Sequence, residues 1–205
     1  MAISYPISLP SAFAVARIVV RQNNTVGKSV SPFSAESQTY VHQGQWWEAE
    51  IQLPPMQRDD AEDVLGAFLS LRGAEGTMLL PAPNPAIRGA GGGTPVVDGA
   101  GQTGLELAVR GGPLSATNWL KAGDWIQLGS GSSTRLHKVL VAASTDGTGD
   151  CTLDIWPRLR SSPADGATIT LANCKGVFEL SSNAQEYTIE AGMKYGYAFA
   201  CRERV

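Results

Sequence analysis

The sequence is poor in the residue types from which catalytic and metal sites are usually built. Its 205 residues include two histidines, His42 and His137, and three cysteines, Cys151, Cys174 and Cys201. The cysteines are odd in number and widely spaced, whereas a disulfide framework or a zinc site needs pairs or tetrads. We therefore expect free, buried thiols, and neither a metal nor a cofactor.

The sequence also lacks the features of a membrane segment or a secretory signal. It has no run of about 18 apolar residues, so no transmembrane helix is expected. The beginning of the chain carries no positively charged region, and Pro6 and Pro10 interrupt its apolar stretch, unlike a signal peptide. We expect a protein that is made in a cytosol and is not inserted into a membrane.

An excess of basic residues is absent as well. Lysine and arginine number 16 against 19 aspartates and glutamates, which gives a net charge of −3. Proteins that coat nucleic acid need an excess of basic side chains to displace counterions from phosphates. Specific nucleic-acid binding is therefore not expected.

What the sequence does contain is many turn-forming residues. Glycine and proline number 23 and 12, while hydrophobic residues make up 43% of the chain and charged residues 17%. This composition favours a globular, mainly β fold with short strands over a helix bundle. The chain length fits one large domain, or one domain with a smaller domain inserted, because domains usually span about 100–200 residues.

The clearest pattern lies between residues 45 and 73. Alternating positions place four apolar side chains on one face of a strand, namely Trp47, Ala49, Ile51 and Leu53. The other face carries Trp46, Glu48, Glu50 and Gln52. Such alternation is typical of a half-buried antiparallel strand. After Pro54 and Pro55, apolar residues at helical spacing predict one helix over 57–72, with acidic residues at its start and Gly73 as its left-handed cap.

The composition changes after residue 84. Residues 83–104 are rich in glycine and poor in core-forming side chains. Short strand-like segments separated by turn residues then predict a small β-barrel or sandwich, and they span 105–110, 124–129, 135–143, 151–159 and 167–172. The end of the chain returns to longer aromatic strands. We predict a discontinuous outer domain, residues 1–84 and 174–205, with a β-barrel domain, residues 85–173, inserted into it.

One motif is reminiscent of nucleotide binding. Gly99, Gly101 and Gly104 match the pattern G-x-G-x-x-G. A dinucleotide fold needs a helix to begin there, so that its first amides face the pyrophosphate. The residues that follow, LELAVRGGP, are extended in character and then reach a breaker. A turn-forming loop is therefore the better interpretation.

Neither histidine has the sequence context of a catalytic residue. His42 and His137 fall in different predicted domains, and no serine lies in a G-x-S-x-G context. We expect His137 on the surface of a strand. A glycosidase can work with two carboxylates alone, and that possibility stays open. Our prediction is a protein without enzymatic activity and without catalytic residues.

Tryptophan side chains could bind sugars or bases by stacking. Trp47 shares its predicted face with Ile51, which indicates a core residue. Trp46 lies on the opposite face and is a candidate contact for another protein. In the predicted inserted domain, Trp125 and Trp156 are candidate contacts for a ligand or partner, with core packing as the alternative.

Most of the chain resembles the distal tail proteins, or minor tail proteins, of long-tailed (siphovirus-type) bacteriophages and prophages. The resemblance is carried by residues 31–85 and by the segments VVDGAGQTG, LKAGDWIQLGSG, LDIWPRLRSSPADGATI and KGVFEL. It implies a tail-tube-like β-sandwich with one flanking α-helix. It also implies an inserted or appended small β-barrel of the OB-like type.

The resemblance implies a structural subunit of the phage tail tip. Such proteins form a ring, commonly a homohexamer, which connects the tail tube to the baseplate or tip and its receptor-binding proteins. The implied partners are copies of the chain itself, the tail tube protein, the tape measure and the tail hub or tip proteins, while DNA passes through the ring. The implied location is the virion, after assembly in the cytoplasm of the bacterial host. The candidate interface is then the face with Trp46, Glu48, Glu50 and Gln52.

Two alternative functions stay open. The first is a carbohydrate- or receptor-binding module of the tail tip, with Trp125 or Trp156 in contact with the ligand. The second is a tail-associated cell-wall hydrolase, which the lack of a recognisable acid and base set disfavours.

Overall fold

The computed structural model describes residues 3–204 and is mainly β, as the sequence predicts. A seven-stranded sheet has the order β1-β4-β11-β13-β3-β2, and β12 pairs with β13 beside this path. Its pairs are antiparallel except for β1 with β4. The strands are β1 (Ile7–Ser8), β2 (Arg17–Val30), β3 (Ser37–Gln52), β4 (Thr77–Pro81), β11 (Lys175–Leu180), β12 (Tyr187–Glu190) and β13 (Lys194–Glu203).

A second sheet forms the barrel-like domain. Its order is β10-β7-β8-β9-β6-β5, and it curls until its ends meet, because Val96 of β5 forms a bridge to Thr168 beside β10. The strands are β5 (Val96–Val97), β6 (Gly104–Arg110), β7 (Trp125–Leu128), β8 (Arg135–Val139), β9 (Cys151–Leu159) and β10 (Ile169–Thr170), with a 3-10 turn η1 (Gly131–Ser133) before β8. All of them lie within the segment 85–173 that the sequence sets apart.

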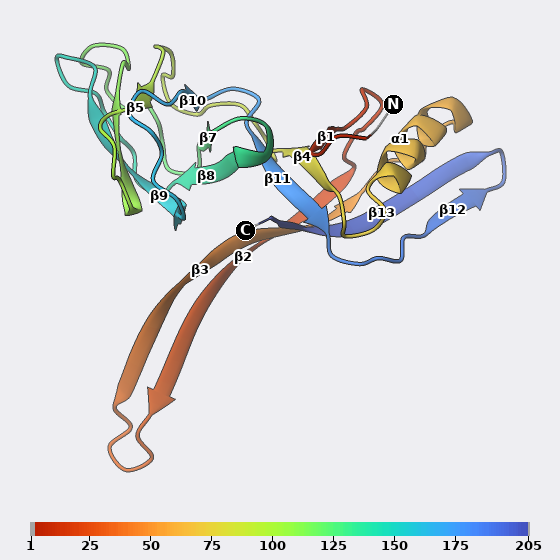
Figure 1. Cartoon of the computed structure of the whole chain (residues 1–205), viewed down its shortest axis with the longest axis horizontal. Coiled ribbons are helices and arrows are strands. Elements are labelled where there is room, and N and C mark those ends of the chain that lie inside the picture. The colour runs from red at the N-terminus through yellow and green to blue at the C-terminus, as the bar shows by residue number, and fades with distance from the viewer. Residues whose placement is uncertain (1–2, 205) are drawn as a thin grey trace.

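The helix α1 (Arg58–Ser70) covers one face of the seven-stranded sheet (Figure 1). Its inward stripe consists of Ala61, Val64, Leu65 and Phe68, all buried. The Phe68 ring lies 4.5 Å from that of Phe199 and 4.8 Å from that of Tyr197, both on β13. Burial of each large side chain contributes about 1.5–3 kcal/mol, so this stripe fixes the helix on the sheet.

The helix ends at Ser70, two residues before the predicted end, and its C-cap is Leu71. Gly73 has a φ of +73°, the left-handed conformation that a residue without a Cβ adopts easily. Arg72 before it also has a positive φ, of 53°, so the turn contains two left-handed residues. This turn sends the chain from α1 into β4.

Strands β2 and β3 form a hairpin that extends far beyond the rest of the sheet (Figure 1). We call its outer part, residues 22–44, the arm. The alternation in the sequence marks a strand only over 45–53, whereas β3 is one strand of 16 residues and β2 pairs with it as far as Val30. The arm is exposed on both faces, so backbone pairing rather than burial holds it together.

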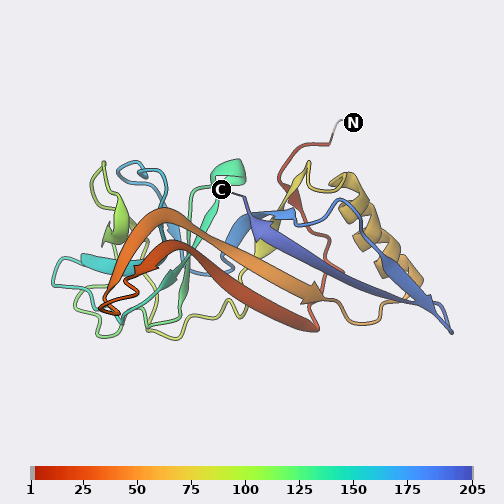
Figure 2. The same ribbon diagram turned by 90° about the horizontal axis from the view of Figure 1, so that it is seen from below.

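The two sheets meet at a tryptophan cluster at the base of the arm. The Trp47 ring of β3 lies 4.9 Å from that of Trp125 and 4.2 Å from that of Trp156. Its Nε1 donates a hydrogen bond to the Leu136 carbonyl at 3.1 Å, and Trp156 Nε1 donates to Asn24 Oδ1 at 3.0 Å. Figure 2 shows that the barrel and α1 lie toward opposite ends of the molecule and that the seven-stranded sheet connects them.

Candidate functional site

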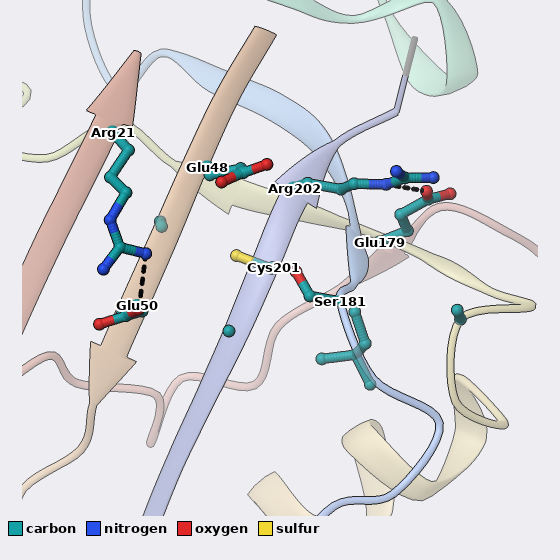
Figure 3. A pocket seen from close by; sticks show the side chains of 11 residues that line it. Arg21, Glu48, Glu50, Glu179, Ser181, Cys201 and Arg202 are labelled. Atoms are coloured by element: carbon teal, nitrogen blue, oxygen red, sulfur yellow. Dashed lines mark hydrogen bonds and ion pairs between the residues drawn. The ribbon is translucent and has the colours of Figure 1, made fainter. Parts of the chain in front are cut away.

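The face of β3 opposite the core is a polar surface that crosses four strands. The alternation in β3 is confirmed, because Trp47, Ala49, Ile51 and Leu53 are all buried. Trp46, Glu48, Glu50 and Gln52 share the other face and line shallow depressions there. The depression shown in Figure 3 has a volume of about 450 Å³ and takes residues from β2, β3, β11 and β13.

The carboxylates of this face are already hydrogen-bonded. Glu50 accepts a bond from Arg21 at 2.6 Å, and Glu48 accepts one from Trp46 Nε1 at 2.9 Å. Glu179, which is buried, accepts a bond from Arg202 at 2.7 Å (Figure 3) and a second bond from Arg204 at 2.6 Å. Arg21 and Glu50 are both about half exposed, and such surface ion pairs contribute only about 0.2–1 kcal/mol. This pair can therefore exchange partners at an interface at little cost. The buried Glu179, by contrast, needs its two arginines, because an unpaired buried charge is strongly destabilising.

Besides the short edge strand β1, the seven-stranded sheet has two free strand edges, those of β2 and β12, and they carry opposite charge. β2 ends the sheet, and its outer edge carries Arg17, Arg21 and Lys28 without any acidic residue. β12 pairs with β13 on the side opposite β3, so its outer edge is also free. Glu190 in β12 and Glu186 just before it carry negative charge. Free edges present unpaired backbone groups and favour pairing with another strand.

The arm carries exposed apolar side chains. Val26, Val30, Tyr40 and Val41 are exposed along it, and Phe33 at its tip is 99% exposed. Monomeric proteins rarely leave a whole element so uncovered, which indicates a contact surface. The arm could not be predicted from the sequence, because residues 22–30 lack the alternation that marks a buried face.

The other candidate contacts, Trp125 and Trp156, are core residues of the junction. Each is 7% exposed and packs against Trp47. The core-packing alternative is therefore confirmed. A sugar ring could reach these indole faces only if the barrel moved away from β3.

The prediction for His137 is wrong, because its side chain is buried. It is 4% exposed, and Nδ1 lies 2.7 Å from the Pro157 carbonyl, to which a protonated Nδ1 donates. Burial lowers the pKa of His137 to about 4, so the ring is neutral at pH 7. β8 is buried on both faces, between the barrel core and the junction, which the sequence pattern did not indicate. His42 is exposed on the arm, so the histidines do not converge.

The three cysteines are free, as predicted. Cys174 and Cys201 are buried, while Cys151 is half-buried. Burial raises the pKa of Cys151 and Cys174 to about 11 and that of Cys201 to about 12. These thiols are therefore protonated at neutral pH and are poor nucleophiles.

The glycine motif is a loop, as predicted. Gly99, Gly101 and Gly104 all have positive φ, between 80° and 90°. Gly104 begins β6, so a strand follows where a nucleotide site needs a helix. The Gly99 amide donates to Asp165 Oδ1 at 2.9 Å, within the barrel domain.

Across residues 3–204, no group of three or more His, Cys, Asp or Glu side chains is arranged to hold a metal ion. Within the same range, no helix has both the length and the apolar character needed to cross a membrane.

Comparison with known proteins adds no relative. No protein-family model matches the chain, and a search of curated proteins found no match. The free edges, the arm and the polar face of β3 are therefore the features on which a functional proposal rests.

Proposed function

We propose that the chain is a structural subunit of the phage tail tip. It assembles into a ring, with six copies as in the family it resembles, that connects the tail tube to the baseplate or tip and its receptor-binding proteins. The observation that carries this proposal is the presence of two free, oppositely charged strand edges on opposite sides of one sheet. The arm and the polar face of β3 are then available to adjoining tail proteins.

The two edges suit a closed assembly because they differ. Across the sheet the order runs β12-β13-β3-β2, so the β2 edge of one copy can pair with the β12 edge of the next. A contact between unlike surfaces leaves one edge free at each end of a chain of copies. Such heterologous contacts form a ring when the rotation between copies closes. Closure pairs every β2 edge with a β12 edge.

The charges on the two edges are opposite in sign and equal in spacing. Arg17 and Arg21 are four residues apart on β2, and Glu186 and Glu190 are four apart at β12. Residues four apart in a strand point to the same face and can pair across an antiparallel neighbour. Each opposite-charge pair contributes about 0.2–1 kcal/mol, and like charges there destabilise. The charges select the partner, while backbone hydrogen bonds hold it.

The oligomeric state of the purified protein is the first test of this proposal. Light scattering coupled to size exclusion and negative-stain microscopy should find a closed ring of several copies. A protein that stays monomeric at high concentration contradicts the proposal.

Charge reversal tests which edges meet. Arg17→Glu with Arg21→Glu gives a chain whose two edges are both acidic, and Glu186→Lys with Glu190→Lys gives one whose edges are both basic. Each variant alone should lose ring formation, because repulsion weakens each contact by about 1–2 kcal/mol, or about 5- to 30-fold. An equimolar mixture should form rings in which the variants alternate. Circular dichroism of each variant controls for folding.

The mixture also separates charge pairing from nonspecific damage. Arg21 bonds Glu50 in the same chain, so its replacement removes an internal pair. If that loss were the cause, mixing could not restore assembly. Rings that form from either variant alone would show that these edges do not pair.

A further inference from the structure

Two features of the molecule are left unused by edge pairing: the tip of the arm and a groove beside α1. We propose that Phe33 at the tip of one copy inserts into the groove between α1 and β12 of a second copy. The groove includes Tyr187 of β12, but the contact uses side chains of α1, β12 and β13 rather than the outer edge of a strand. It can therefore be tested apart from the proposed ring.

The tip is a turn with its own hydrogen bonds. Ser31 N donates to the Glu36 carbonyl at 2.8 Å, and Ala35 N donates to the Ser31 carbonyl at 3.0 Å. The Ser31 hydroxyl accepts bonds from the amides of Phe33 and Ser34. The turn therefore has a defined shape, and it presents the 99% exposed Phe33 ring at the end of the arm.

The groove is apolar and large enough for a phenyl ring. It has a volume of about 450 Å³, and its rim includes Arg72, Gly73 and residues 183–185. Its apolar wall consists of Leu65, Phe68, Leu69, Tyr187 and Tyr197. Leu69 and Tyr187 are 75% and 51% exposed, although both are large apolar residues. An apolar cavity of about 150 Å³ already holds benzene, so the size is sufficient.

The charges around the two features are complementary. Glu36 is the only charged residue between Ser31 and Gln38. Arg72 is the only charged residue among those that line the groove. Arg72 makes a loose contact of 4.0 Å with Glu75, and both side chains are more than 60% exposed. The Arg72 guanidinium is therefore free to pair with Glu36 when Phe33 enters the groove.

The groove that receives Phe33 must belong to another copy. Leu53, which follows β3, bonds to Tyr197 in the wall of the groove, and the tip lies at the other end of β3. A strand of 16 residues spans about 50 Å at about 3.3 Å per residue. The two features therefore lie at opposite ends of the molecule (Figure 1). The contact therefore joins two copies that are offset from each other along the direction of β2 and β3.

Cysteine cross-linking tests the contact directly. A Phe33→Cys variant mixed with a Leu69→Cys variant should form a disulfide-linked heterodimer under mild oxidation, resolved by a mass tag on one partner. Val41→Cys replaces Phe33→Cys in the matched control, because Val41 is 72% exposed on the arm but lies away from the tip. A heterodimer yield no higher than with Val41→Cys overturns the proposal.

Solution binding provides a second readout. In sedimentation experiments, Phe33→Ala should weaken the association between the tip of one copy and the groove of another at least tenfold. Phe33→Trp should retain this association. Glu36→Arg and Arg72→Glu should each weaken it, and the double variant should restore it. Unchanged association of Phe33→Ala, or loss of binding only to another tail protein, contradicts a contact between copies.

The two proposals fail separately. Arg17→Glu with Arg21→Glu should abolish rings and leave the Phe33–Leu69 cross-link intact. Phe33→Ala should leave rings intact. Loss of the cross-link in every variant that loses the ring would show that the contact of Phe33 with the groove is not an interface separate from the ring.

Discussion

His137 is the residue whose surroundings most directly link the structure to pH. Its ring is buried, and its pKa falls from 6.5 to about 4. Arg135 and Arg160 lie near enough to disfavour a second positive charge there. The unfolded chain therefore binds a proton between pH 6.5 and 4 that the folded chain does not bind. Linkage then requires stability to fall as the pH falls through this window.

The first prediction concerns this window. Unfolding by denaturant should show a loss of up to about 3 kcal/mol between pH 7 and pH 4, at about 1.36 kcal/mol per unit of pKa difference. His137→Asn keeps a donor for the Pro157 carbonyl but does not titrate, so it should flatten the slope. His42→Asn is the matched control, because His42 is exposed on the arm. An equal slope in His137→Asn would assign the pH dependence to other groups.

At the scale of elements, the arm differs from the rest of β3. The inner half of the strand alternates buried and exposed residues, while residues 37–43 are exposed at every position. Elements with few buried contacts open locally at low cost in free energy. Whether such an element stays ordered then depends on its contacts with other molecules.

Hydrogen exchange should resolve this difference. Amides of residues 22–30 and 37–43 should exchange much faster than those of residues 47–52 in the monomer. Assembly should slow the arm's exchange, because contact with another copy or another tail protein covers it. An arm that is fully protected in the monomer would show that it needs no partner.

The same contrast explains what the sequence could predict. Residues 45–53 and α1 were recognisable because burial on one side imposes a period, which Ile51 and Phe68 follow. Residues 22–30 carry no such period, since neither face is buried. The polar face with Glu48 and Glu50 followed from the alternation. The Trp47 contact with Trp125 and the groove at Leu69 did not, because both depend on segments far apart in the sequence.

At the scale of the whole molecule, Trp47 connects the two sheets. One core contains α1 and the large sheet but also takes in Trp125, Leu136 and Trp156 from the barrel. Beside it, Arg160 of the barrel domain bonds to the buried Glu203 of β13 at 2.8 Å. Two domains that share a core in this way should unfold together.

Removing Trp47 tests that coupling. Trp47→Ala should lower the free energy of unfolding by about 3–5 kcal/mol, because it deletes a buried aromatic side chain and leaves a cavity. The unsubstituted protein should show one calorimetric transition, and Trp47→Ala should split it into two. The reason is that the barrel keeps its own core around Leu107, Ile126 and Leu153. Trp46→Ala is the matched control. Trp46 is the neighbouring tryptophan on the opposite face, and its loss should cost less than about 1 kcal/mol. A Trp47→Ala protein that still unfolds in one transition would mean that the Arg160–Glu203 pair and the backbone connections suffice to couple the domains.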